Sequence, residues 1–282
     1  MEQNFETMFA ERCPNHTFLL SRMRCALGVS RIEFSHITTS NLHKFREYME
    51  GEVTSNSLKT YFAVFKAFVR ECHNDGLVRS DKCLSALKVK STPQQNVALT
   101  ESEVRALQQY YDRLLTNEGH KVEKDVLTLF LIECLCGARG CDVESMTVNN
   151  IHDGRLTYIS KKTKVLATMP VHKRLADLLA RKPKKEYSRV TKNRIVKEAC
   201  KRCGIIEPVT ICYHGSMVTR PKYEFCAFHT ARRSFASILA AKGAPITEIA
   251  QYMSHSNTMM TNRYIKVDTN NASAAALSFF ND

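Results

Sequence analysis

The sequence lacks the long apolar segments of membrane proteins and the N-terminal signal pattern of secreted proteins. Its longest nearly apolar run, residues 126–138, is shorter than the about 20 residues that cross a bilayer, and it contains Glu133. No basic segment followed by an apolar stretch opens the sequence, so we expect no secretory signal and a cytoplasmic location. The eleven cysteines have no regular spacing, which favours reduced thiols over a disulfide-stapled fold.

Acidic residues are scarce relative to basic ones, which gives the 282 residues a formal net charge of +13. Most of the excess lies between residues 161 and 202, where fifteen Lys or Arg stand against three Asp or Glu. Apolar residues at helical spacing interrupt this basic segment, so the cations belong to folded structure and not to a tail. A solvated surface is one interpretation of the segment. The other, which we favour, is a surface that binds a phosphate backbone.

The chain also lacks the carboxylate clusters that hold Mg²⁺ in metal-dependent nucleases. No Glu-x-Lys or Asp-x-Lys pair of the nuclease type occurs, and the close acidic pair Glu101 and Glu103 belongs to a helix cap. We therefore expect no metal and no other cofactor. A zinc site is a weaker alternative, because its nearest candidate set lacks a second well-spaced pair and consists of Cys200, Cys203, Cys212 and His214.

The spacing of apolar residues predicts a mainly α fold with a small β-sheet, divided into two domains. Residues 1–88 are expected to form short helices, of which the clearest follows the cap candidates Thr54 and Ser55, while another is expected to begin at Ser40. Residues 89–97 are polar, contain a proline and lack periodicity, which indicates a linker. The second domain is expected to cover residues 98–282.

The second domain is predicted to surround a buried helix. Residues 126–136 are apolar on nearly every side, as a central helix would be, and a capping box at residues 100–103 opens the helix before it. Strand-like runs at residues 155–160 and 165–171 form a hairpin whose basic tip projects cations. Further helices are predicted at residues 172–180, 191–203, 231–242 and 246–252.

Three short motifs stand out in this second domain. Taken singly, each has an ordinary explanation: a surface ion pair, a hydrogen-bonded core histidine or a packed tyrosine. Together they place two arginines, two histidines, an acidic residue and a tyrosine in a fixed order. The motifs are Arg139 with Asp142, then His229 with Arg232, then His255 followed by Tyr264.

In order and spacing these motifs resemble the catalytic signature of the tyrosine recombinases, or phage integrase family. Residues 137–142 are similar to its first box, residues 229–235 to its second and residues 246–264 to its third. Ala138 stands where Leu is common, and Ser254 stands where Gly is usual; neither change removes a functional atom. The likeness is weaker in the first domain, where the family usually places a helical, SAM-like core-binding domain before its α-rich catalytic domain.

The resemblance implies a site-specific DNA recombinase that works without metal or ATP. Such enzymes integrate, excise, invert or resolve DNA, and Tyr264 would attack a phosphodiester to leave a 3′-phosphotyrosyl link. Lys162 would protonate the departing 5′ oxygen, although Lys161 and Lys164 are close rivals. The same chemistry in a type IB topoisomerase-like enzyme is one alternative, and a DNA-binding regulator without catalysis is another.

Physical chemistry favours the same residues for this reaction. Ionising a free tyrosine at pH 7 costs roughly 4 kcal/mol, so a base or a positive field must offset that cost. Arg139 and Arg232 are planar, permanently charged donors that can hold the two non-bridging phosphate oxygens. By resemblance, His229 acts as general acid or base near the tyrosine, His255 donates a hydrogen bond to phosphate, and Asp142 steadies the cations.

The resemblance also implies the partners. We expect a homotetramer on two DNA duplexes, with accessory DNA-bending proteins possible and no membrane contact. The small-residue segment 271–280 is expected to dock on a neighbouring subunit, with packing on its own subunit as the alternative. The target sequence does not follow from residue spacing. Candidate DNA contacts are Lys59, Lys66 and Arg70 in the first domain, and Lys161 and Lys164 at the hairpin tip of the second.

Overall fold

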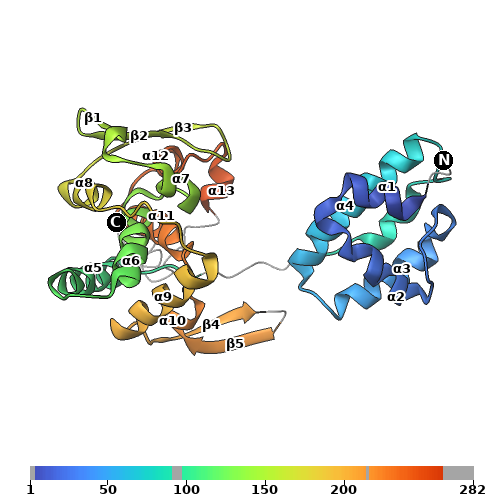
Figure 1. Cartoon of the computed structure of the whole chain (residues 1–282), viewed down its shortest axis with the longest axis horizontal. Helices are drawn as coiled ribbons and strands as arrows, with labels where there is room; N and C mark the ends of the chain where they lie inside the picture. Colours follow the sequence, from blue (N-terminus) through green and yellow to red (C-terminus); the bar gives the residue numbers. More distant parts are fainter. Residues whose placement is uncertain (1–3, 91–96, 214–215, 263–282) are drawn as a thin grey trace, which may run out of the picture. The chain divides into compact units, whose positions relative to one another are not determined.

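Figure 1 shows the computed structural model of the chain, which describes residues 4–90, 97–213 and 216–262. The chain divides into two compact units, one of residues 1–94 with 212–217 and the other of residues 95–211 with 218–282. Each unit encloses its own hydrophobic core, and helices dominate both. The mainly α fold with little sheet is confirmed. Most of the expected linker, residues 91–96, lies outside the described residues.

The first unit is a helical bundle around a phenylalanine-rich core. Phe5 and Phe9 each meet the ring of Phe68 nearly edge-on, with ring centroids 5.2 and 5.0 Å apart. Such rings are the largest single contributors to hydrophobic burial, about 2 kcal/mol each. The helices are α1 (Phe5–Arg12), α2 (Phe18–Leu27), α3 (Thr39–Glu50) and α4 (Ser55–Asn74), joined in part by the 3-10 turns Pro14–His16, Phe34–His36 and Lys82–Leu87.

Side chains cap α1, α3 and α4 in this unit, whereas α2 begins without a side-chain cap. Of the two cap candidates, Thr54 caps α4, because its hydroxyl accepts a hydrogen bond from the backbone N–H of Ser57, and Ser55 is the first residue of the helix. The expected cap Ser40 is wrong. Thr38 caps α3 instead, since its backbone is extended and its hydroxyl accepts from the N–H of Asn41, which draws Ser40 into the first helical turn.

The second unit is built around helix α6 (Lys121–Cys136), which packs against α5, α8, α9 and α11. Burial on nearly all sides explains its apolar sequence from Val126 onward. The predicted capping box of α5 is confirmed, with Thr100 and Glu103 each bonding the other's backbone N–H. The surrounding helices are α5 (Glu101–Thr116), α7 (Gly140–Ser145), α8 (Lys173–Ala180), α9 (Arg189–Arg202), α10 (Lys222–Phe225), α11 (Thr230–Ala241), α12 (Ile246–Tyr252) and α13 (Thr258–Asn262).

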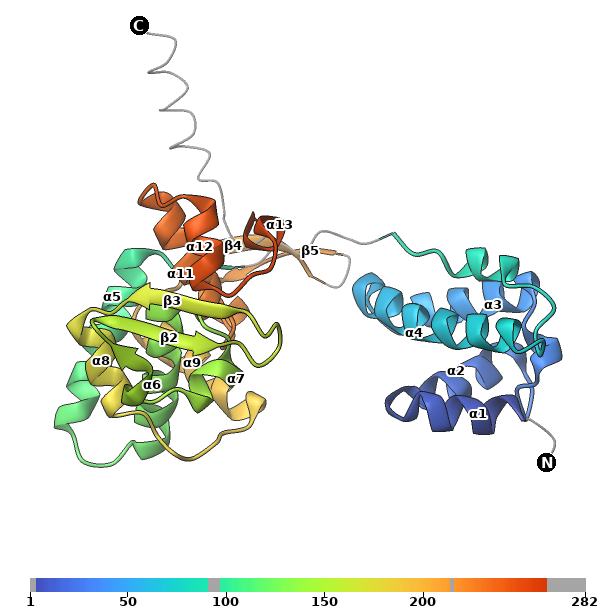
Figure 2. The ribbon, with the colours of Figure 1, turned by 90° about the horizontal axis from the view of Figure 1, so that it is seen from above.

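The predicted hairpin is confirmed and belongs to a three-stranded antiparallel sheet. Strands β1 (Ile151–His152), β2 (Arg155–Ile159) and β3 (Leu166–Pro170) are adjacent in that order, after the 3-10 turn Val148–Asn150. Alternation along β2 and β3 buries one face of the hairpin against the unit. Figure 2 shows this hairpin in front of α6 and α7.

A second, two-stranded sheet was not predicted from the sequence. Strands β4 (Pro208–Tyr213) and β5 (Ser216–Pro221) form it. The parts of these strands that belong to the second unit lie at the opposite end of that unit from the first sheet in Figure 1. Among the side chains of these strands whose burial is described, only Ile211 is buried. Val209 and Ile211 alternate with Thr210, but two apolar positions are too few to predict a strand. The expectation of one small sheet is therefore corrected to two.

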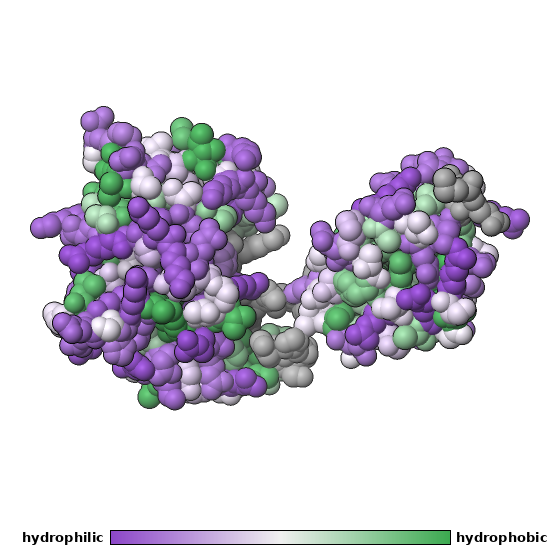
Figure 3. Space-filling model, in the orientation of Figure 1, coloured by the Kyte–Doolittle hydropathy of each residue, from purple (hydrophilic) through white to green (hydrophobic). Residues whose placement is uncertain are grey.

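Hydrophilic side chains cover most of the visible surface of the second unit, and its hydrophobic patches on that face are separate from one another (Figure 3). The large apolar residues that are exposed include Ile159 and Leu166, which pair next to the turn of the β2–β3 hairpin. Within the described parts of the chain, no helix is both long and apolar enough to span a membrane.

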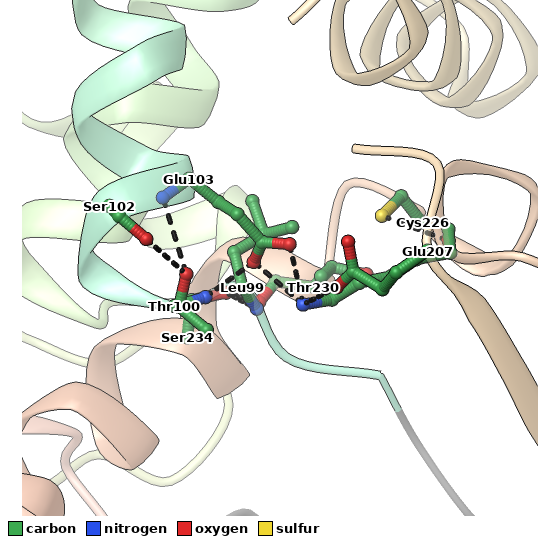
Figure 4. A network of polar contacts seen from close by, with 9 residues as sticks. Leu99, Thr100, Ser102, Glu103, Glu207, Cys226, Thr230 and Ser234 are labelled. Carbon is green, nitrogen blue, oxygen red and sulfur yellow. Dashed lines mark hydrogen bonds and ion pairs between the residues drawn. The ribbon is translucent and has the colours of Figure 1, made fainter. Parts of the chain in front are cut away.

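An ionic network ties the start of α5 to α10 and α11 (Figure 4). Lys222 is almost completely buried, and its Nζ donates to Glu103 at 2.6 Å and pairs with Glu207 at 2.9 Å. Beside it, the backbone N–H of Leu99 donates to Ser234 Oγ at 2.8 Å. Because α11 also carries Arg232, this network fixes the helix that presents a predicted catalytic residue.

Candidate active site

The three sequence motifs converge in the second unit. Arg139 is the N-cap residue of α7, Arg232 lies on α11, and His255 follows α12. Three consecutive residues join the two guanidinium groups: Met253 and His255 contact Arg232, while Ser254 contacts Arg139. Segments more than a hundred residues apart thus meet at one place.

Arg232 is completely buried and held by two backbone carbonyls. Its Nη1 donates to the carbonyl of Gly137 at 2.5 Å, and its Nη2 donates to the carbonyl of Met253 at 2.7 Å. The same Nη2 donates to Nε2 of His255 at 2.7 Å. A buried guanidinium is stable only with such partners, so the group is locked in one plane before any ligand arrives.

Gly137 makes this arrangement possible. It ends α6 with a left-handed backbone, φ 65°, which glycine adopts without steric cost. A Cβ at this position would lie 2.3 Å from Cδ1 of Phe235 on α11. The missing side chain therefore allows α6 and α11 to approach, and it leaves the Gly137 carbonyl directed at Arg232.

Among the described residues, Arg139 is held by hydroxyl groups and not directly by a carboxylate. Its Nη1 donates to Ser160 Oγ at 2.9 Å and to Ser254 Oγ at 3.1 Å. Ser160 in turn donates to Asp142 at 3.0 Å, and the backbone N–H of Lys161 donates to the other oxygen of the same carboxylate at 2.8 Å. Asp142 therefore acts on Arg139 through Ser160 and anchors the base of the hairpin tip.

The candidate lysines lie on the exposed tip of the β2–β3 hairpin. Lys161, Lys162 and Lys164 are all solvent-exposed, and Lys164 has a left-handed backbone with φ 57°. Because Lys161 N–H is bonded to Asp142, the tip begins next to the arginine site. The choice of Lys162 as the acid stays a prediction, since the backbone places all three lysines on the same short turn.

His255 is buried and accepts a hydrogen bond from a cation. Its Nε2 faces Arg232, and its Nδ1 lies 2.8 Å from the hydroxyl of Thr261 on α13. Burial, followed by the charges of Arg232 and Arg139, lowers the pKa of His255 to about 3. The ring is therefore neutral at pH 7 with its proton on Nδ1, so a hydrogen bond from Nε2 to phosphate requires Nε2 to leave Arg232 and to take up the ring proton.

His229 stands at the N-cap of α11 with its side chain 45% exposed. Partial desolvation and the charges of four nearby arginines lower the pKa of His229 to about 4. A neutral imidazole at pH 7 can accept a proton. Its Nδ1 lies 3.8 Å from Oε1 of Glu133, a residue that the motifs did not single out.

Ser254 is a further residue whose contact the sequence did not reveal. It stands where the family usually has glycine, and its backbone is left-handed with φ 51°, a conformation that favours glycine. Its hydroxyl contacts Arg139 and also donates to the Met253 carbonyl. The position of an unusual polar residue beside His255 was the available signal.

Several predicted residues fall outside this cluster. Tyr264, the tail segment 271–280 and His214 of the weak zinc set lie outside the described residues. Among described residues, no group of three or more His, Cys, Asp or Glu side chains is arranged to hold a metal. The candidate DNA contacts of the first unit share a face of α4, because they are seven and four residues apart: Lys59, Lys66 and Arg70.

Comparison with protein families agrees with this arrangement. The model of the phage integrase family matches residues 81–271, and that of the phage integrase SAM-like domain matches residues 9–89. The chain therefore belongs to the phage integrase family, the tyrosine-type site-specific DNA recombinases. The predicted family and the SAM-like character of the first unit are confirmed. No curated protein matches the sequence.

Solved structures share the fold over nearly the whole chain. A lambda integrase fragment, a dimer bound to a COC′ core site, is 17% identical with a TM-score of 0.66, covering 94% of this chain and 93% of that one. Tn1549 transposon integrase with transposon right end DNA is 14% identical with a TM-score of 0.67, covering 99% and 100%. XerH recombinase bound to a palindromic difH substrate is 13% identical with a TM-score of 0.64, covering 98% and 80%.

Proposed function

We propose that this recombinase breaks DNA by attack of the Tyr264 hydroxyl on a phosphodiester, without metal or ATP. The observation that carries the proposal is the pairing of Arg139 with the buried Arg232 through the single stretch Met253 to His255. Two adjacent guanidiniums suit the two non-bridging oxygens on which charge grows as phosphorus becomes five-coordinate. Their rigid support means that little reorganisation accompanies the reaction.

The protons and bonds of the step balance with this chain's own residues. His229, neutral at pH 7, takes the phenol proton while the tyrosine oxygen bonds to phosphorus. The bond from phosphorus to the 5′ oxygen breaks, and a hairpin lysine, for which Lys162 is our choice, supplies the proton to that oxygen. The 3′-phosphotyrosyl link keeps the phosphodiester energy, so the 5′ hydroxyl of a second strand can reverse the step.

Double-stranded DNA carrying a specific site is the proposed substrate. The net charge of +13 supports a polyanionic partner. The related structures named above are complexes with DNA, and lambda integrase has been solved as a tetramer bound to a Holliday junction. We extend both properties to this chain as proposals: a homotetramer on two duplexes, with Lys59, Lys66 and Arg70 of α4 among the DNA contacts.

One apolar groove suits the tail segment 271–280. The groove has a volume of about 370 Å³ and lies among α5, α6, β3, α11 and α12, where its apolar lining includes Val104, Leu135, Ile238 and Leu239. The tail sequence ends in Leu277 and two phenylalanines, which matches such a lining. We propose that the tail of one subunit fills the groove of its neighbour.

Truncation at Ser273 tests this assembly. The truncated chain is expected to bind single DNA sites normally but to pair two sites poorly in native gel shifts. A Leu239→Glu variant, which places a charge in the groove, is expected to give the same result in the full-length chain. Normal pairing of sites by both variants would exclude docking of the tail on a neighbour.

A nicked suicide duplex separates the proposed activity from its alternatives. Duplexes built from the DNA that flanks the gene are incubated with the protein, and covalent adducts are resolved in denaturant. A site-specific recombinase gives an adduct on few sequences, a topoisomerase-like enzyme gives one on many, and a regulator gives none. Adducts on unrelated duplexes, or no adduct despite binding, would contradict the proposal.

A further inference from the structure

We propose that Glu133 is a positioning residue that accepts a hydrogen bond from Nδ1 of His229 and so presents Nε2 for proton exchange with the nucleophile. The inference rests on the proposed function and assigns a role to a carboxyl group that no motif includes. Its basis is a juxtaposition in the second unit: a buried carboxyl in an otherwise apolar stretch, at the edge of the arginine site.

The buried position of Glu133 is unfavourable for the stability of the fold. It is completely buried on the inner helix α6, flanked in sequence by Ile132 and Cys134, which are also buried. Neither carboxyl oxygen has a hydrogen-bond partner among the described residues. Burying a carboxyl without such partners opposes folding, and an apolar side chain would fill the same space at no such cost. Packing therefore does not account for the residue.

The carboxyl is directed at His229 across a short gap. Oε1 lies 3.8 Å from Nδ1, so an approach of about 1 Å would produce an ordinary hydrogen bond. Oε2 points toward Gly140, where a Cβ would lie 3.9 Å away. A cavity of about 480 Å³ is lined by Glu133, Gly140, Lys192 and His229, so the two side chains share one open space in which to adjust.

Charges around the pair favour a carboxylate partner for the ring. Arg233, Arg232, Arg139 and Arg189 all oppose a proton on His229. Glu133 is the acidic side chain paired with the ring, and a carboxylate there offsets the charge of the imidazolium. Around Glu133 itself, burial disfavours the ionised form most strongly, Arg232 on α11 and Lys192 on α9 favour it, and Asp142 and Glu144 on α7 disfavour it.

With this assignment, every proton that moves in the reaction has a donor and an acceptor. Nδ1–H of His229 donates to Glu133, which leaves the lone pair of Nε2 to take the phenol proton as the tyrosine oxygen bonds to phosphorus. The positive charge gained by the ring lies beside the carboxylate. On rejoining, Nε2 returns the same proton to the tyrosine oxygen as that oxygen leaves phosphorus.

Two substitutions test the role, with a matched control on the same helix. Glu133→Leu removes the carboxyl, and Glu133→Gln removes its charge while keeping its size. The control is Thr128→Val, because Thr128 is also buried on α6 but bonds to Tyr111 and the Lys124 carbonyl, away from His229. Each full-length protein is measured for thermal unfolding, DNA affinity and the rate of adduct formation on the suicide duplex.

We expect opposite effects of Glu133→Leu and Thr128→Val on stability and on the rate of adduct formation. Glu133→Leu should unfold at the same or a higher temperature, bind DNA within about twofold of wild type, and form adduct about 10- to 100-fold more slowly, in the range of general-base effects. Thr128→Val should unfold at a lower temperature and form adduct at the wild-type rate. A merely structural Glu133 would give the reverse pattern, with Glu133→Leu less stable and its rate normal per folded molecule.

The pH profile supplies a readout that a structural role would not move. Desolvation raises the pKa of Glu133 well above its usual value, so wild-type adduct formation should decline on acidification as this carboxylate is protonated. Glu133→Gln cannot titrate there, and loss of a negative charge also lowers the pKa of His229. The acid limb of its profile should therefore move to lower pH, with a lower plateau. An unmoved acid limb would overturn the assignment.

Failure of this inference is distinguishable from failure of the proposed function. Wild-type protein that gives no adduct would overturn the proposed function, and this inference with it. Wild-type protein that gives a Tyr264-dependent adduct, together with Glu133→Leu at the same rate, would overturn the inference alone. Ring-nitrogen NMR adds a test without DNA, because the protonated nitrogen of His229 should be Nδ1 in wild type and lose this preference in Glu133→Leu.

Discussion

Nη2 of Arg232 lies 2.7 Å from Nε2 of His255, and both side chains are buried. The guanidinium donates in this contact, so the imidazole is neutral and its remaining nitrogen faces Thr261. A phosphate that enters the site competes with the histidine for the same guanidinium. The site is thus preorganised, with its cation already oriented by neutral acceptors that an anion can replace.

Arg232→Lys should disable the site although it conserves charge. A lysine cannot donate to the carbonyls of Gly137 and Met253 in one plane, so at least one buried carbonyl loses its partner. We expect a loss of about 2 kcal/mol in unfolding free energy and a fall of about 100-fold or more in adduct formation. Urea denaturation and the suicide duplex measure the two effects. A variant with wild-type rates would show that the guanidinium geometry is unimportant.

Gly137→Ala should destabilise the second unit more than an ordinary left-handed glycine would. The new Cβ would overlap the ring of Phe235 and also strain the backbone, so we expect a loss of about 3 kcal/mol. Gly204→Ala is the matched control, since Gly204 has φ 75° but no atom within 4 Å of an added Cβ, and it should cost about 1 kcal/mol. Equal losses of unfolding free energy in the two variants would show that α6 and α11 leave enough space for a side chain at residue 137.

The sequence predicted the architecture where periodicity was strong. The apolar stripe from Leu58 to Cys72 and the buried run from Val126 to Cys136 both became helices whose burial matches the pattern. It failed where burial was slight, as in β4 and β5. Short helices such as α7 and α13 were also not predicted, because five or six residues show too little periodicity to distinguish a helix from a turn.

The sequence predicted the motif residues of the candidate site but not the residues that support them. Arg139, Asp142, Arg232 and His255 are brought together as the motif order suggested. The hydroxyl of Ser160, which connects Arg139 to Asp142, has no signal in the sequence because it depends on hairpin register. Glu133 was visible as a charge in an apolar run, but nothing in the sequence showed that it faces His229.

Substitutions at Ser254 separate backbone strain from the hydroxyl contact. Ser254→Ala loses the contact with Arg139 and keeps the left-handed strain, whereas Ser254→Gly loses the contact and relieves the strain. The glycine variant should therefore be more stable than the alanine variant by about 1 kcal/mol. Adduct formation should fall equally in both. Equal unfolding free energies would show that the left-handed backbone is not strained.

Stability should decrease on mild acidification because of His255. Its pKa is lowered to about 3 in the folded chain, so the unfolded chain binds the proton more tightly. The contribution of the neutral His255 to the unfolding free energy is fully present above pH 6.5 and is lost as the pH falls toward 3. Between pH 7.5 and 5.5 the loss of unfolding free energy is about 1 kcal/mol. Urea denaturation at both pH values measures it, and His255→Gln, which does not titrate, should show a smaller pH difference. The same pH difference in both proteins would contradict the assignment of the effect to His255.

Comparison of wild type with Tyr264→Phe on the suicide duplex tests the central claim most directly. Both proteins are incubated in EDTA, denatured and digested, and the peptide that carries DNA is identified by mass spectrometry. The account predicts an adduct on Tyr264 in wild type, and no adduct in the phenylalanine variant despite near-normal DNA affinity. An adduct that persists in the variant, or one on another residue of wild type, would contradict it.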